Sequence, residues 1–178
     1  MQPLRPITTG LDGVGLPTKD LQELWFATRR RDWTSLAVTP AHAGGSAMPV
    51  AEALRQMSQL IKRPARLVQA DNLDLTDVAT LVTSMSMPRS SAWSSTVARS
   101  TSASLGQSSM EHGGDELLIV AVEPVVVNPL VLPLVLATDA VLLVMEQGKT
   151  DLASAQHTID LIGREKLLGC VLLTPKKK

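Results

Sequence analysis

The chain has 178 residues, of which 44% are hydrophobic and only 2% are aromatic, and its 17 Lys and Arg balance 17 Asp and Glu. This length allows one α/β domain with a substantial core and is too short for two such domains. Because the net charge is zero, the composition argues against a broad electrostatic surface for nucleic acid or for anionic lipid.

The N-terminal part predicts a flexible segment over residues 1–18, rich in Pro, Gly and Thr, followed by a helix from about Lys19 to Arg31. Trp25 and Phe26 are adjacent, so one helix face cannot bury both, and one of them is a candidate partner contact. The three arginines Arg29, Arg30 and Arg31 suit the end of a helix, where cations are favoured by the helix dipole, and a binding patch is the less favoured interpretation.

The rest of the chain alternates between strand-like and helix-like patterns. Apolar segments predict strands at 35–39, 66–70, 117–122, 140–145 and 167–173. Helical spacing predicts helices that start near Val50, over 74–85 and over 151–165, with a short apolar crossover at 128–138. Alternation of this kind implies parallel strands joined by right-handed crossovers. The predicted fold is therefore α/β, a doubly wound and mostly parallel sheet with helices on both faces, as one domain over residues 19–175.

Two further segments have distinctive compositions. Residues 86–114 are dominated by Ser and have few large apolar side chains, which predicts a mobile insertion whose Trp93 either pins it to the domain or contacts a partner. The tail 176–178 is three lysines, which we expect to be solvated, with weak attraction to an anionic membrane as the lesser alternative.

No span or leader is expected from the sequence. The apolar stretch 117–145 is interrupted by Pro124, Pro129 and Pro133, which fits strands and a helix better than a membrane span. The N-terminus has no charged region followed by an apolar region, so we expect a cytoplasmic protein. The single Cys170 lies in an apolar run and is interpreted as a buried free thiol.

The segment between the first strand and its helix has the layout of a phosphate-binding loop. In such loops backbone amides and a helix N-terminus hold the phosphates, a Lys reaches the terminal ones, and a Ser or Thr hydroxyl binds Mg²⁺. Aligned by strand and helix, the pattern G-x-G-K-S-T falls on these residues: Gly44, Gly45, Ser46, Ala47, Met48 and Pro49. The Lys and the hydroxyl are missing, although the bare backbone of the loop could still bind an anion.

Four segments in series carry a resemblance to a known family: VTPAHAGGSAMPVAEAL, RLVQAD, LLIVAVEP and TDAVLLVMEQGKTDLASAQHTIDLIGREKLLGCVLL. In order and spacing they resemble the cytoplasmic domain of bacterial tyrosine autokinases of exopolysaccharide and capsule export, which are relatives of the MinD and ParA deviant-Walker ATPases. The resemblance covers about residues 20–174 and implies a P-loop NTPase-like fold.

The residues that carry catalysis in that family do not match. The phosphate-binding Lys corresponds to Ala47 and the Mg²⁺-binding hydroxyl to Met48. In the acidic motif after the second strand, Gln69 replaces the first Asp and only Asp71 remains, and Ala121 stands where a later Asp would hold the metal. Losses in three motifs of one site imply an inactive member of the family, with no catalytic residue, no metal and no cofactor.

Two other departures concern the family's regulation. The chain contains no Tyr, so it cannot phosphorylate its own tyrosines. Phe26 stands where the family has an Arg between Glu23 and Arg29, so the family's ring assembly is not carried over.

Other sequence signals for a site are weak. The turn Gly148-Lys149-Thr150 follows its strand too closely to wrap a phosphate, and Thr150 is expected to cap the following helix. His42, His112 and His157 lack the spacing of metal ligands.

The resemblance implies a non-catalytic scaffold or regulator of exopolysaccharide or capsule assembly. Its expected partner is a membrane-bound polysaccharide co-polymerase or a related kinase, which would place the protein at the inner membrane through that partner, and a homodimer is possible. Two alternatives stay open: a nucleotide-independent positioning or secretion-system adaptor of the MinD and ParA type, and a residual nucleotide-binding switch.

Overall fold

The structure is a computed structural model that describes residues 19–86 and 116–174. Its centre is a five-stranded, all-parallel sheet with the strand order β2-β3-β1-β4-β5. The strands are β1 (Ser35–Pro40), β2 (Ala65–Ala70), β3 (Leu117–Val122), β4 (Ala140–Glu146) and β5 (Leu167–Leu173). This sheet, flanked by helices, is the doubly wound α/β fold that the sequence predicts.

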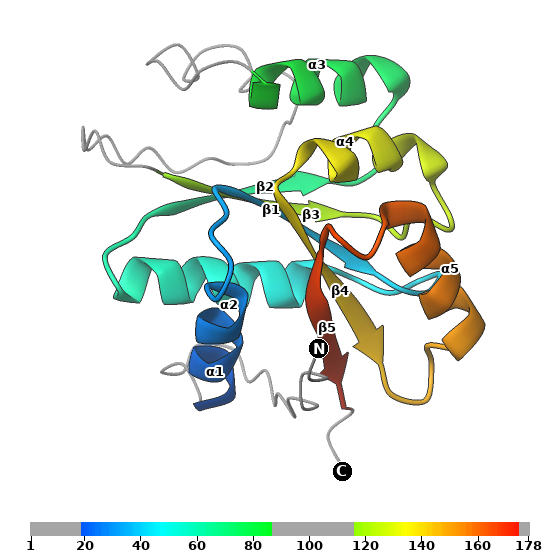
Figure 1. The fold of residues 1–178 in the computed structure, drawn as a ribbon. Coiled ribbons are helices and arrows are strands. Elements are labelled where there is room, and N and C mark those ends of the chain that lie inside the picture. Colours follow the sequence, from blue (N-terminus) through cyan, green and yellow to red (C-terminus); the bar gives the residue numbers. More distant parts are fainter. Residues whose placement is uncertain (1–18, 87–115, 175–178) are drawn as a thin grey trace.

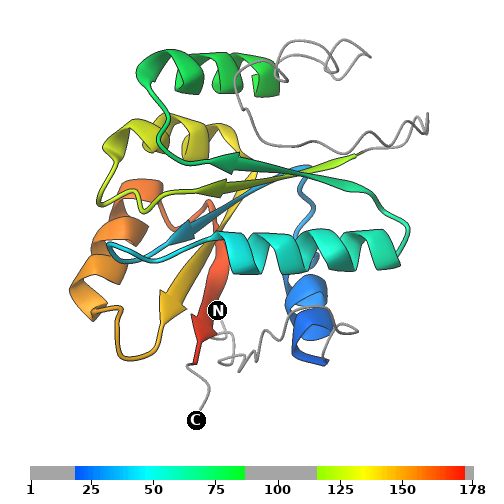
Figure 2. The same ribbon diagram turned by 180° about the vertical axis from the view of Figure 1, so that it is seen from behind.

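The helices cover both faces of the sheet (Figures 1 and 2). Two of them, α1 (Lys19–Thr28) and α2 (Met48–Leu60), lie on one face. The other face is covered by α3 (Leu75–Ser86), α4 (Leu132–Ala137), which follows the short 3-10 helix η3 (Pro129–Val131), and α5 (Leu152–Ile162). Each crossover from strand to parallel strand therefore has a helix that buries its apolar face on the sheet.

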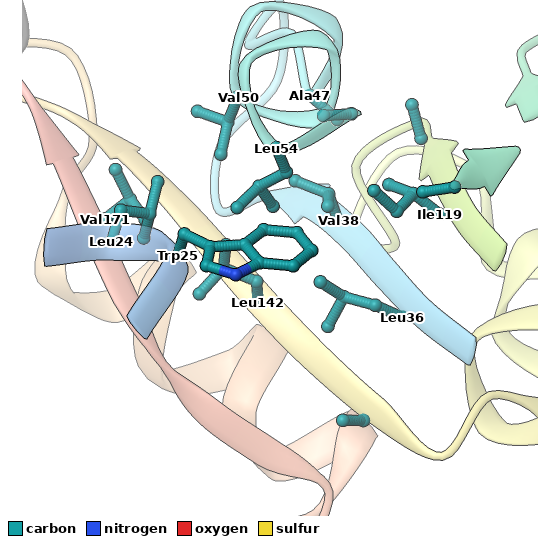
Figure 3. Packing of buried hydrophobic residues seen from close by; sticks show 14 of the residues in the cluster. Leu24, Trp25, Leu36, Val38, Ala47, Val50, Leu54, Ile119, Leu142 and Val171 are labelled. Carbon is teal, nitrogen blue, oxygen red and sulfur yellow. The ribbon is translucent and has the colours of Figure 1, made fainter. Parts of the chain in front are cut away.

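The three central strands are buried on both faces, because helices lie above and below them. Every residue of β1 and of β3 is buried, which explains why LLIVAV shows no polar alternation. On the α1 and α2 face the core includes Trp25, Leu36, Leu54 and Leu142, and Figure 3 shows the indole ring of Trp25 beside these leucines. A fold with so few aromatic residues thus places one Trp at the centre of its main core.

Two helices are shorter than the sequence predicts. Helix α1 ends at Thr28, whose hydroxyl donates to the Trp25 carbonyl oxygen at 2.8 Å, so the arginines that follow lie beyond the helix. Helix α5 ends at Ile162, because Gly163 has φ +88° and turns the chain into the left-handed region. Ser86, assigned to the insertion, is the last residue of α3.

Some predictions fall outside the described residues. These are the flexible segment 1–18, the rest of the Ser-rich insertion with Trp93, and the lysine tail 176–178. Within 19–86 and 116–174, no helix combines the length and the apolar character needed to cross a bilayer.

Asp139, which precedes β4, joins the amino ends of β1 and β4. One of its carboxylate oxygens accepts from the Thr34 backbone N–H (2.8 Å), the Thr34 hydroxyl (2.7 Å) and the Ser35 backbone N–H (2.8 Å). Burial acts to raise the pKa of Asp139, but the bonds from Thr34 and Ser35 outweigh it and lower that pKa to about 2. The carboxylate therefore connects the starts of β1 and β4.

We expect Asp139→Asn to lower the free energy of unfolding by about 1 kcal/mol at neutral pH, since the carboxyl group is exposed and solvent screens its bonds. The folded-state pKa lies below the ordinary 3.8, so this stability is present above about pH 4 and is lost as the pH falls toward about 2. Urea denaturation of both proteins across that range checks this. A difference that stays constant with pH would contradict it.

Candidate functional site

The candidate site lies where the strands end, which we call the carboxyl edge. There the loop 41–47 leads from β1 into α2. Its backbone turns tightly, because the Gly45 N–H donates to the His42 carbonyl oxygen at 3.2 Å and Gly44 has φ +77°. A side chain at Gly45 would meet Pro40 Cβ at 2.7 Å and the His42 ring at 2.8 Å. The two glycines are thus required by the turn itself, independently of any ligand.

The residue aligned with the phosphate-binding Lys faces the core. Ala47 is only 4% exposed and belongs to the apolar cluster with Val50 and Leu54, as Figure 3 shows. Met48 is half-buried and packs against the same cluster, while its backbone N–H donates to the Ser46 hydroxyl at 3.3 Å. The two positions that would carry the cation and the metal ligand therefore serve packing.

The ends of β2 and β3 are tied together by Glu123. One carboxylate oxygen accepts from the Asn72 backbone N–H at 2.8 Å, and the other accepts from the Asn128 side-chain amide at 3.1 Å. Its carbonyl oxygen also accepts from the Thr39 hydroxyl at 3.2 Å. This residue connects the end of β1 with the segments after β2 and β3, a role that its sequence context does not reveal.

The remaining degenerate positions lie beside this connection. The Gln69 side-chain amide donates to the Asp71 carboxylate, and both residues are exposed. Ala121 is buried within β3, where its backbone pairs with Gln69 on one side and Val38 on the other. The structure therefore brings Gln69 and Asp71 together at the surface and keeps Ala121 inside the sheet.

A second network joins the loop after β1 to the turn after β4. The His42 ring is buried, and its Nδ1 is hydrogen-bonded to the Thr150 hydroxyl oxygen at 2.8 Å. The same oxygen accepts from the Glu146 backbone N–H at 2.8 Å. His42 Nε2 lies 4.0 Å from the Glu146 carboxylate, whose other oxygen pairs with Lys149 at 2.7 Å.

The expectation that Thr150 caps α5 is wrong. Asp151 is the N-cap, since its carboxylate accepts from the Ser154 backbone N–H at 2.7 Å. Thr150 closes the preceding turn and holds His42. In the sequence, His42 and Thr150 are simply polar residues that each follow a predicted strand. Only the strand order, in which β1 lies beside β4, shows that the two residues meet.

We expect Thr150→Val to lower the free energy of unfolding by about 1–2 kcal/mol, because it leaves the Glu146 N–H and the buried His42 ring without their shared partner. Thr150→Ser keeps the hydroxyl and is the matched control, with an expected loss below about 0.5 kcal/mol. Chemical denaturation measures both. Equal losses in the two variants would show that the hydroxyl group does not account for the effect.

The candidate partner contacts divide between core and surface. The prediction that Trp25 is a candidate partner contact is wrong, because Trp25 is 1% exposed and belongs to the core. Its ring packs edge-on against Trp33, with the two ring centroids 6.2 Å apart. Phe26 is 64% exposed and is the member of the pair at the surface. The guanidinium of Arg29 lies 5.0 Å from the centroid of the Trp33 ring and donates to the Trp33 carbonyl oxygen at 2.8 Å.

The other two arginines also differ from each other. Arg31 donates to the Glu165 carbonyl oxygen, whereas Arg30 is exposed. The helix-dipole role expected for the three does not hold, because α1 ends before them.

Two further residue types bear on chemistry. Cys170 is half-buried in β5, and burial raises the pKa of its thiol. A search of residues 19–86 and 116–174 finds no group of three or more His, Cys, Asp and Glu that could hold a metal ion.

Comparisons of the chain with protein-family models, with curated proteins and with solved structures found no match in any of the three.

Proposed function

We propose that the chain is a non-catalytic, P-loop-like scaffold or regulator that works through protein contacts in bacterial exopolysaccharide or capsule assembly. The parallel sheet with helices on both faces agrees with a P-loop-like fold. Because many unrelated functions share this fold, the choice among them depends on the site. The pathway rests on the resemblance of the chain to the cytoplasmic domain of tyrosine autokinases.

The single observation that carries the non-catalytic part is how the polar groups of the carboxyl edge are bonded. His42 is bonded to Thr150, Glu123 to Asn72 and Asn128, and Glu146 to Lys149. The groups are engaged with one another across the segments that follow β1, β2, β3 and β4, and the position aligned with the phosphate-binding Lys points into the core. Such an edge holds strands together, whereas phosphoryl transfer needs a cation and a metal ligand directed at the phosphates.

The function is tested in the native host by deleting the gene and restoring it in two forms. The first is the unaltered gene and the second carries Ser46→Ala with Asp71→Asn, which removes the loop hydroxyl and the remaining acid of the degenerate motif. We expect deletion to reduce or alter the secreted polysaccharide and both genes to restore it fully.

Two results would contradict the proposal. If deletion leaves the polysaccharide unchanged, the assignment to this pathway is wrong. If the double variant folds but restores nothing, the loop and Asp71 have a chemical role, and the residual nucleotide switch becomes the better interpretation. Neighbouring genes for glycosyltransferases and polymer export would favour this pathway over a positioning adaptor.

A further inference from the structure

Although the net charge of the chain is zero, the described acidic and basic residues concentrate at opposite ends of the sheet. At the carboxyl edge and in the first turns of the helices that start there, carboxylates predominate: Asp71, Asp74, Asp77, Glu123, Glu146 and Asp151. At the opposite end, where helices finish and strands begin, five exposed cations gather, which we call the basic edge: Arg30, Arg31, Lys62, Arg63 and Arg164.

Two interactions connect parts of this edge. Arg31 donates to the Glu165 carbonyl oxygen, which joins the segment after α1 to the segment after α5. Arg29 lies within electrostatic range of Arg63, whose charge acts with burial to lower the Arg29 pKa against the opposing effect of Asp32. The segment before β1 therefore interacts with the segments that lead to β2 and to β5, which are the two edge strands of the sheet.

Among the described residues, four carboxylates at the same end offset part of this charge, but they are fewer than the seven cations there: Asp32, Glu116, Asp139 and Glu165 against Arg29, Arg30, Arg31, Lys62, Arg63, Arg164 and Lys166. Asp139 is occupied by the backbone and hydroxyl groups of Thr34 and Ser35, and Asp32 pairs with Arg29 at 3.6 Å. Lys166 donates to the carbonyl oxygens of Leu136 and Thr138 and contributes further positive charge. The edge thus keeps an excess of positive charge.

Exposed aliphatic side chains accompany the cations. At the end of α2, Leu60 is 55% and Ile61 is 42% exposed, immediately before Lys62 and Arg63. Leu136, at the end of α4, is 41% exposed and accepts from Lys166 through its carbonyl oxygen. Large apolar side chains beside Lys and Arg are typical of surfaces that lie in the interface of an anionic membrane.

We propose that the basic edge docks directly on an anionic lipid surface. Each Lys or Arg near such a surface is attracted to its negative potential, and Leu60 and Ile61 can enter the boundary between headgroups and acyl chains. The acidic carboxyl edge is repelled by the same potential, so the charge separation also orients the molecule, with the carboxyl edge facing away from the lipid. This docking goes beyond the scaffold function and does not depend on it.

The test is co-sedimentation of the full chain with vesicles of phosphatidylglycerol and phosphatidylcholine in equal parts, and with vesicles of phosphatidylcholine alone. We expect binding to the first only, and loss of that binding at high salt, where screening is strong. The triple variant R30Q/K62Q/R63Q should bind on the order of 100-fold more weakly, at about five-fold per cation.

The matched control is K176Q/K177Q/K178Q, which removes the same charge from the tail after β5. It should keep binding within about three-fold, since it leaves every cation of the basic edge in place. A second variant, L60S/I61S, should lose binding several-fold while keeping its salt dependence, and thermal melting shows that each variant is folded.

Four results would overturn the docking proposal. They are a wild-type chain that does not bind the anionic vesicles, a triple variant that binds as the wild type does, a tail variant that loses as much as the triple variant, and salt-sensitive self-association without vesicle binding. The last would assign the basic edge to the acidic edge of a second copy. None of these outcomes depends on nucleotide binding or on the polysaccharide phenotype, so the scaffold function stands or fails separately.

Discussion

Replacing Trp25 with Ala is expected to lower the free energy of unfolding by about 3–5 kcal/mol, the largest effect of any single truncation proposed here. The indole ring is 1% exposed and lies beside Leu36 and Leu142 under helix α2, with Trp33 against its edge (Figure 3). Its removal leaves a cavity at the point where α1 meets the sheet.

The matched control is Phe26→Ala in the next position of the same helix. Phe26 is 64% exposed, so its truncation should change stability by less than about 0.5 kcal/mol. Urea denaturation of the two variants beside the wild type measures both effects. Equal losses would show that α1 does not pack as described.

The second large effect is expected from Ala47→Lys, which restores the residue that a phosphate-binding loop would have at this position. Ala47 is 4% exposed within the apolar cluster of α2, so the new ammonium group starts in the core and has no partner there. We expect a loss of about 3 kcal/mol and no gain in nucleotide affinity.

Ser46→Lys provides the control, since Ser46 is the exposed neighbour of Ala47. Both lysines lie near the N-terminus of α2 and meet the same unfavourable helix dipole, so the difference between them isolates burial. The exposed lysine should cost about 0.5 kcal/mol. If thermal and chemical denaturation showed A47K to be as stable as S46K, Ala47 would not face the core.

The sequence predicted the layers of the fold well because the signal was local. Short uninterrupted apolar segments such as 117–122 are typical of strands buried on both faces, and helical spacing in 152–162 identifies the crossover that follows β4. The spacing of Asp74 and Asp77 predicts a capping box at the start of α3, and the structure confirms it, since the Asp77 N–H donates to the Asp74 carboxylate at 2.8 Å. Helix ends were less accurate, because Thr28 and Gly163 act through hydrogen bonds and backbone angles.

The polar networks could not be predicted, because they join residues far apart in the chain. His42 and Thr150 are 108 residues apart, and Glu123 reaches back 51 residues to Asn72. These contacts depend on the strand order, in which β1 lies between β3 and β4. The sorting of charge was hidden for the same reason: a net charge of zero argues against a charged surface only if both signs are mixed, and here the fold separates them.

A non-catalytic role requires above all that the carboxyl edge does not bind a nucleoside triphosphate. Isothermal titration calorimetry of the purified chain with ATP, with and without Mg²⁺, tests this most directly, and ADP and a chelator provide the controls. We predict no saturable heat under any of these conditions. Binding with micromolar affinity that requires Mg²⁺ and disappears with the chelator would contradict the claim.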